Sequence, residues 1–315
     1  MPASQLPHQL DRLFLTDGGL ETSLIYNDGL ELPAFASFPL LESEAGRDAV
    51  TRYYRPYVEA ARRGGYGFVF ETITWRANPD WGGELGYDRA ALDRVNRDAV
   101  AYARELEASA ALEGPTVISG NIGPRGDGYV IGSAMTADEA AAYHAEQIGS
   151  FATAEVDVVS VFTMNYSDEA IGVARAAQAA GLPAIVSFTL ETDGRLPSGE
   201  SIGEAIEKVD AAAPGAVAYF MINCAHPTHF AETIPADAPW LNRIAGLRAN
   251  ASTKSHAELD ASTELDAGDP ADLAVRYIDL RRRLPALAVF GGCCGTDDRH
   301  VAAIGAAILG VETSA

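Results

Sequence analysis

Short, nearly continuous apolar runs recur along the chain and alternate with longer stretches whose apolar residues have helical spacing. The runs are rich in β-branched residues and carry few charges, which is typical of strands buried on both faces of a sheet. Eight such runs are present, at 13–17, 67–74, 116–123, 156–163, 183–190, 216–223, 242–250 and 286–292.

Several of the intervening stretches begin with residues that favour a helix start. Ser43 precedes a long amphipathic segment that ends at Gly64 and Gly65, as expected for an N-cap and a glycine stop. Thr136 and Glu139 have the spacing of a capping box ahead of an Ala-rich segment. Ser167 and Thr296 open two further predicted helices.

Eight alternating strand and helix units predict an α/β protein whose parallel strands close into a (β/α)8, or TIM, barrel. The length of 315 residues suits one such barrel, so we expect residues 1–315 to form a single domain. A doubly wound open sheet is the alternative. No G-x-G-x-x-G follows the first run, which removes the usual dinucleotide-binding version of that fold.

Composition and charge restrict the partners of the chain. The formal net charge of −21 repels nucleic acid and anionic membranes, so neither is expected as a partner. No apolar run approaches the ~18 residues of a membrane span, and the start MPASQLPHQLDRLF lacks a signal-peptide core, which predicts a cytoplasmic protein. Three cysteines, two of them adjacent, cannot form a disulfide framework and suggest a reduced compartment. Whether the chain forms a homo-oligomer is left open.

The barrel prediction indicates where chemistry would occur, because active sites of such barrels lie at the carboxyl ends of the strands. The unusual polar residues of this sequence fall there. They are Asp17, Glu71, Thr72, Asn121, Asn223, Cys224, Asn250, Cys293 and Cys294. All three cysteines of the chain are therefore expected on one rim of the barrel.

The cysteines Cys224, Cys293 and Cys294 form a candidate zinc site. Soft thiolate ligands select zinc over magnesium or calcium, and a catalytic zinc keeps one of its four positions open for substrate. Gly291 and Gly292 would let the backbone fold tightly enough for two neighbouring cysteines to reach one ion. The alternatives are that the cysteines are small buried residues of no chemical consequence, or that Cys224 binds metal together with His226 and His229.

Several motifs along the chain resemble those of the homocysteine S-methyltransferase family. They run from DGGLET (17–22) through TWRANP (74–79), GNIGP (120–124), SFTL (187–190) and INC (222–224) to GGCCGT (291–296). The resemblance implies a (β/α)8 barrel in which Cys224, Cys293 and Cys294 hold a catalytic Zn²⁺ ion. It also implies transfer of a methyl group from a small-molecule donor to a small thiol acceptor.

The expected reaction is attack of a substrate thiolate on the methyl group of a sulfonium donor, S-methylmethionine or S-adenosylmethionine, with homocysteine becoming methionine. Zinc at the open position would keep the substrate sulfur ionised at neutral pH. Trp75 could hold the cationic methyl group against its ring, and Glu21 could bind a substrate ammonium group or simply begin a helix. The predicted substrate-binding residues are Asp17, Glu21, Glu71, Thr72, Trp75, Asn121, Phe162, Asn223 and Asn250.

Two positions depart from the family pattern. Phe162 lies where the family usually carries a glutamate that holds the amino group of homocysteine, so Glu71 or Glu191 takes that role or the acceptor is another thiol. Arg76 replaces an aromatic residue of the betaine enzyme, which disfavours betaine as the donor. The alternatives are the same chemistry on a different thiol or methylated substrate, a subunit that acts with a separate corrinoid protein, and a non-catalytic barrel with a structural zinc.

Overall fold

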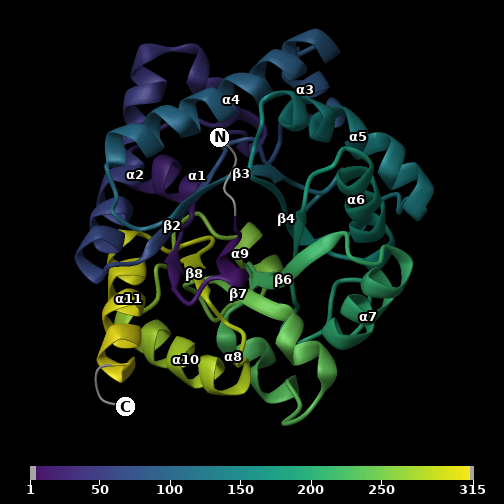
Figure 1. Cartoon of the computed structure of the whole chain (residues 1–315). Coiled ribbons are helices and arrows are strands. Elements are labelled where there is room, and N and C mark those ends of the chain that lie inside the picture. Colours follow the sequence, from purple (N-terminus) through teal and green to yellow (C-terminus); the bar gives the residue numbers. More distant parts are fainter. Residues whose placement is uncertain (1–4, 313–315) are drawn as a thin grey trace.

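The computed structural model describes residues 5–312, and within them a closed barrel of parallel strands runs in sequential order from β1 to β8. Figure 1 shows the helices as an outer ring around these strands. The α/β barrel prediction is therefore confirmed. The described residues contain no helix that is long and apolar enough to cross a membrane.

Each predicted apolar run contains most or all of one strand of the barrel. The strands are β1 Phe14–Leu15, β2 Gly67–Glu71, β3 Thr116–Ile122, β4 Val158–Met164, β5 Ala184–Phe188, β6 Val217–Asn223, β7 Ile244–Ala249 and β8 Val289–Gly292. Most runs extend beyond their strand, because hydrophobicity continues into the turns that cover the barrel ends. Asp17 and Thr72 consequently lie in loops immediately beyond the carboxyl ends of β1 and β2.

The helices follow the strands on the outside, with short additional helices in the loops. They are α1 Leu20–Thr22, α2 Glu44–Gly64, α3 Pro79–Glu84, α4 Arg89–Ala110, α5 Ala137–Thr153, α6 Ser167–Ala179, α7 Ile202–Ala212, α8 Pro227–Phe230, α9 His256–Asp260, α10 Pro270–Arg283 and α11 Asp298–Glu312.

Two of the four predicted helix starts, Ser43 and Thr136, are N-caps in the structure, whereas Thr296 lies two residues before the first residue of α11. The Ser43 side chain accepts from the Gly46 N–H, and Gly65 ends α2 in the left-handed region at φ 65°. Thr136 and Glu139 form the expected capping box of α5. The N-cap of α6 is Tyr166 and not Ser167, which is the first helical residue.

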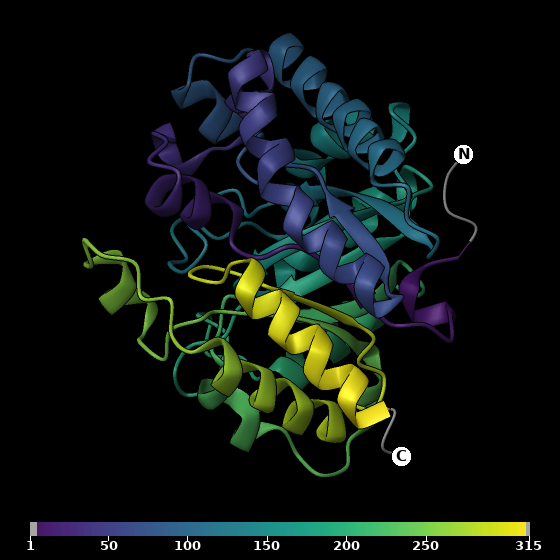
Figure 2. The same cartoon turned by 90° about the vertical axis from the view of Figure 1, so that its left-hand side faces the viewer.

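Two connections at the carboxyl end of the barrel, after β2 and after β7, contain short helices. Residues 75–88 include α3, which Asn78 caps by accepting from the Trp81 N–H. Residues 251–269 include α9. In Figure 2 the yellow-green segment that holds α9 projects beyond the carboxyl edge of the barrel, on the same side as the purple segment after β1. These two segments extend the wall around the barrel mouth.

Apolar side chains fill the barrel interior and separate it from the layer between strands and helices. The interior cluster combines one or two residues from each strand, among them Phe14, Val69, Val117, Val158 and Ile185. A much larger cluster packs the outer faces of the strands against the helices. Polar chemistry is thereby confined to the carboxyl end, above the interior apolar layer.

Candidate active site at the carboxyl edge of the barrel

A cavity of about 400 Å³ opens at the carboxyl ends of the strands. The three cysteines line it together with eight of the nine predicted substrate-binding residues. These eight are Asp17, Glu21, Glu71, Thr72, Trp75, Asn121, Phe162 and Asn223. The ninth, Asn250, is buried behind the cavity wall, where its Nδ2 donates to the Cys224 carbonyl at 3.1 Å.

The three cysteine sulfurs lie within 4.8 Å of one another. Cys224 follows β6 in the left-handed region at φ 52°, and its N–H donates to the carbonyl of Arg248 on β7. The Cys293 N–H donates to the Ala249 carbonyl, which ties the turn after β8 to the same strand. A Cβ on Gly292 would collide with the Thr296 hydroxyl, so this turn requires glycine there. Backbone bonding to β7 thus brings the cysteines of two different loops together.

The donor set fits a thiophilic metal ion. In the structure Cys224 and Cys293 are joined as a disulfide, and Cys294 carries a free thiol. With that bond reduced, three thiolates meet at one point, which is the ligand set of a zinc site that leaves a fourth position free. Metal binding and the disulfide exclude each other, because the ion needs thiolates. Burial raises the pKa of the Cys294 thiol to about 11, so at neutral pH this thiol is protonated unless a cation stabilises the anion.

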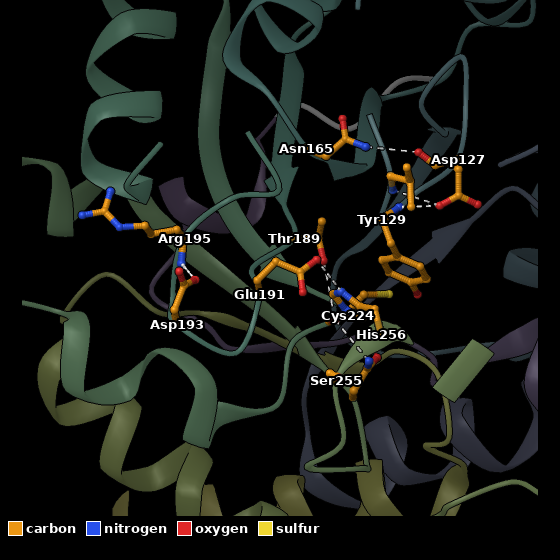
Figure 3. A network of polar contacts seen from close by, with 12 residues as sticks. Asp127, Tyr129, Asn165, Thr189, Glu191, Asp193, Arg195, Cys224, Ser255 and His256 are labelled. Atoms are coloured by element: carbon orange, nitrogen blue, oxygen red, sulfur yellow. Dashed lines mark hydrogen bonds and ion pairs between the residues drawn. The ribbon is translucent and has the colours of Figure 1, made fainter. Parts of the chain in front are cut away.

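The carbonyl of Cys224 is held by groups that the sequence did not single out. His256 on α9 donates from Nε2 to this carbonyl at 2.5 Å, and its Nδ1 lies 3.1 Å from Glu191 Oε1. The Tyr129 ring stacks on the His256 ring with centroids 3.9 Å apart. Figure 3 shows Tyr129 and His256 beside Cys224. Glu191, weighed above as a substrate ligand, therefore already has a partner.

Tyr129 also reaches the cysteine cluster directly. Its hydroxyl lies 3.7 Å from Cys294 Sγ. Burial, followed by the nearby Cys294, raises the pKa of Tyr129 well above its ordinary value, so the hydroxyl stays protonated and can donate to a thiolate. Tyr129 comes from the loop after β3.

A buried ion pair lies beside Gly292, the residue before Cys293. Arg248 Nη2 is 2.7 Å from Asp17 Oδ1, and the Tyr53 hydroxyl donates to Asp17 Oδ2. The other donors of Arg248 are also used, because Nε donates to the Gly292 carbonyl, Nη1 to the Thr16 hydroxyl and Nη2 to the Gly18 carbonyl. Burial lowers the pKa of Arg248, but the negative charges of Asp17 and, next in size, Glu71 outweigh this effect and raise the pKa above its ordinary value. The guanidinium is therefore permanently charged.

Glu71 is the second carboxylate beside Arg248. Burial raises its pKa to about 7, although Arg248 and a hydrogen bond with Ser119 act in the opposite direction. Its Oε2 has no hydrogen-bond partner, and the same is true of the Asn121 Oδ1 atom in the neighbouring strand. Thr72 holds the local geometry by accepting from the Asn121 N–H at 2.9 Å.

The wall formed by β4 and β6 is uncharged. The Phe162 ring lies under the Arg248 guanidinium, 5.1 Å from its Cζ. Asn223 Oδ1 accepts from the Thr163 N–H and from the Ser187 hydroxyl. Its Nδ2 donates to the Thr163 hydroxyl and lies 4.0 Å from Cys293 Sγ. Asn223 is therefore occupied mainly in joining β4, β5 and β6 below the cysteines.

The outer part of the cavity contains a stacked cation. The Arg76 guanidinium lies 4.4 Å from the Trp75 ring centroid and 3.6 Å from that of Trp81. One face of Trp75, the predicted cation-binding ring, is thus covered by Arg76. Glu21 on α1 accepts from the Ser37 hydroxyl, and burial raises the pKa of its carboxyl group.

The alternative metal cluster of Cys224, His226 and His229 does not form. His226 Nδ1 bonds with Thr228, and His229 Nε2 donates to the Thr253 carbonyl. Among the residues that the structure describes, the group of potential ligands that comes together is the three cysteines.

The fold and this site define a (β/α)8 barrel enzyme with a thiol-lined pocket at its carboxyl edge. Comparison with known proteins agrees. The profile of the homocysteine S-methyltransferase family matches residues 14–308, so the chain belongs to this family and is an S-methyltransferase. No curated protein matches the sequence.

Solved structures of the homocysteine methyltransferase MmuM from Escherichia coli share the fold. The metallated form has 19% sequence identity and a TM-score of 0.72, covering 95% of this chain and 97% of that one. The oxidised form has 20% identity and a TM-score of 0.73, covering 96% and 99%. The barrel is therefore that of the family over nearly its whole length.

Proposed function

We propose that this protein is a zinc-dependent methyltransferase that moves a methyl group from a sulfonium donor to the thiol of homocysteine, giving methionine. The observation that carries the proposal is the convergence of three cysteine sulfurs within 4.8 Å in the lining of a cavity, on the edge of the barrel where active sites lie. Membership of the homocysteine S-methyltransferase family supports the same reaction.

Cys224, Cys293 and Cys294 would hold the zinc ion, which when bound supplies the positive charge that keeps a substrate thiol ionised at neutral pH. The surrounding residues fix these ligands. Asn250 and His256 hold the Cys224 carbonyl, and Tyr129 donates toward Cys294. The substrate sulfur forms a bond to the methyl carbon, the donor's carbon–sulfur bond breaks, and its electron pair leaves a neutral thioether. The residues of the cavity contribute by holding the two substrates in line.

The charge of the cavity supports a cationic donor. Seven carboxylates and two guanidinium groups line it, and an excess of negative charge attracts a cation. The carboxylates are Asp17, Glu21, Glu71, Asp127, Asp260, Glu264 and Asp266. Arg76 Nη1 donates to the Gly126 carbonyl, whereas its buried Nε has no partner. An amino-acid sulfonium such as S-methylmethionine suits both features, because its sulfonium matches the negative charge of the cavity and its carboxylate can accept from Arg76.

The test is a methyl-transfer assay on reduced, zinc-loaded protein with a panel of acceptors and donors. We expect methionine to form from homocysteine with S-methylmethionine or S-adenosylmethionine and not with betaine. Arg76→Gln should raise the donor KM by about 10-fold, as expected for one lost charge-assisted hydrogen bond. Methylation of another thiol in place of homocysteine would move the function to that substrate. Absence of transfer with every pair would contradict the proposal.

A further inference from the structure

Two buried oxygen atoms in the cavity wall accept no hydrogen bond. They are Glu71 Oε2 and Asn121 Oδ1, and among the described residues that line the cavity no other buried side-chain acceptor is left in this way. Buried acceptors in native proteins almost always have a donor, because an unpaired one has lost its contact with water. Both atoms therefore indicate a ligand group that carries hydrogen-bond donors.

The two side chains face the same space. In the β2–β3 register Glu71 pairs with Ser119, and Asn121 follows two residues further along the same strand. Residues two apart in a strand point to the same side, and the step between them is about 6.6 Å. A small group between the long Glu71 side chain and Asn121 can thus contact both.

The charges around Glu71 and Asn121, which together form one corner of the cavity, favour a cation. Glu71 and Asp17 are two buried carboxylates against the single guanidinium of Arg248. When Glu71 is ionised, one negative charge is left without a counter-charge. Phe162, on β4 beside β3, is apolar and supplies none. A protonated amine satisfies the unpaired oxygens and the charge together, which a neutral donor does not.

The corner lies next to the cysteine cluster. The carbonyl of Arg248 accepts from the Cys224 N–H, and its Nε donates to the carbonyl of Gly292, the residue before Cys293. Arg248 is also close enough to Glu71 to lower the pKa of that carboxyl group. Arg248 is therefore a neighbour of both Glu71 and the cysteine turns, and Glu71 and the three cysteines line the same cavity.

We propose that Glu71, assisted by Asn121, binds the ammonium group of the thiol acceptor and makes the enzyme select α-amino thiols. This inference rests on the proposed methyl transfer and assigns the amine of its acceptor to β2 and β3. Glu71 acts as a specificity residue and takes no part in the bond changes.

The experiment compares homocysteine with 4-mercaptobutanoate, which has the same thiol and carboxylate but no amine. In the wild-type enzyme we expect a KM for homocysteine at least 10-fold lower than that for 4-mercaptobutanoate. Glu71→Gln should raise the homocysteine KM by roughly 10- to 100-fold, the loss expected for a buried charge-assisted bond, and change the 4-mercaptobutanoate KM less than about 3-fold. Glu59→Gln, which removes the same charge from the surface of α2, should leave both values unchanged.

Equilibrium binding provides a second readout that needs no chemistry. Titration calorimetry of methionine against 4-(methylthio)butanoate should show a preference for methionine that Glu71→Gln abolishes and Asn121→Ala weakens. An unchanged preference in folded, zinc-loaded Glu71→Gln overturns the inference while methyl transfer by the wild type stands. A wild-type enzyme that methylates neither thiol refutes the proposed function, and a wild type that uses both thiols equally refutes the amine site alone.

Discussion

Replacing Arg248 by methionine should cost the protein a large part of its stability. The change keeps the length of the side chain but removes the guanidinium that neutralises Asp17, which is 2% exposed. It also leaves the carbonyls of Gly18 and Gly292 without their donors. Breaking a buried ion pair by removing one partner typically costs about 3–5 kcal/mol. That is a substantial share of the ~5–15 kcal/mol that holds a folded protein together.

The assay is urea-induced unfolding of reduced protein followed by circular dichroism. With a slope of ~3 kcal/mol per molar, the midpoint of Arg248→Met should fall by about 1–1.7 M. Adding Asp17→Asn removes the orphaned charge, so the double variant should be more stable than the sum of the single losses predicts, by at least ~1.5 kcal/mol.

A surface arginine serves as the matched control. Arg282 pairs with Asp279, and both side chains are more than half exposed, at 69% and 61%. Such pairs contribute little, so Arg282→Met should leave the midpoint within about 0.2 M of the wild type. If Arg248→Met behaved like Arg282→Met, or if the two buried substitutions were additive, the pair of Arg248 and Asp17 would not stabilise the fold as reasoned above.

Two further predictions concern groups that line the cavity. Glu71 has a folded-state pKa of about 7 against an ordinary value of 4.5. The folded protein therefore holds a proton that the unfolded chain releases, and stability should fall by about 3 kcal/mol as the pH rises from 4.5 to 7. This decrease, measured as the wild-type minus Glu71→Gln difference in unfolding free energy, would be absent if Glu71 titrated normally. Tyr129→Phe keeps the stack on His256 but removes the hydroxyl near Cys294, and should weaken zinc binding by about 10-fold in chelator competition, a loss typical of ligand-supporting groups. An unchanged affinity would mean that the hydroxyl does not support the thiolate.

The barrel and its cysteine cluster could be predicted because each strand, and the residue at its end, can be recognised from the local sequence alone. Eight apolar runs define the strands, and the position of Cys224 and Cys293 at strand ends places them on one rim. The short helix α3 is hard to predict because Pro79 and two glycines give its segment the composition of a loop, although Asn78 before Pro79 is a helix-start signal.

The partners of the site could not be predicted in the same way, since they depend on which loops meet over the barrel mouth. Arg248 lies in an otherwise apolar strand, and no sequence pattern indicates that its guanidinium points into the barrel and pairs with Asp17. Tyr129 and His256 lie far apart in the sequence and stack only because the loops after β3 and β7 meet. Asn250, predicted as a substrate ligand, donates from Nδ2 to the Cys224 carbonyl, a contact that the sequence does not reveal.

The most direct test of the metal site is the zinc content of reduced protein together with its methyl-transfer activity. We expect one zinc per chain in the wild type, and loss of both the metal and methionine formation in Cys294→Ala or after chelation. His226→Ala, which alters the alternative ligand set, should keep both. Full zinc content in Cys294→Ala, or methyl transfer that survives chelation, would contradict a catalytic zinc held by Cys224, Cys293 and Cys294.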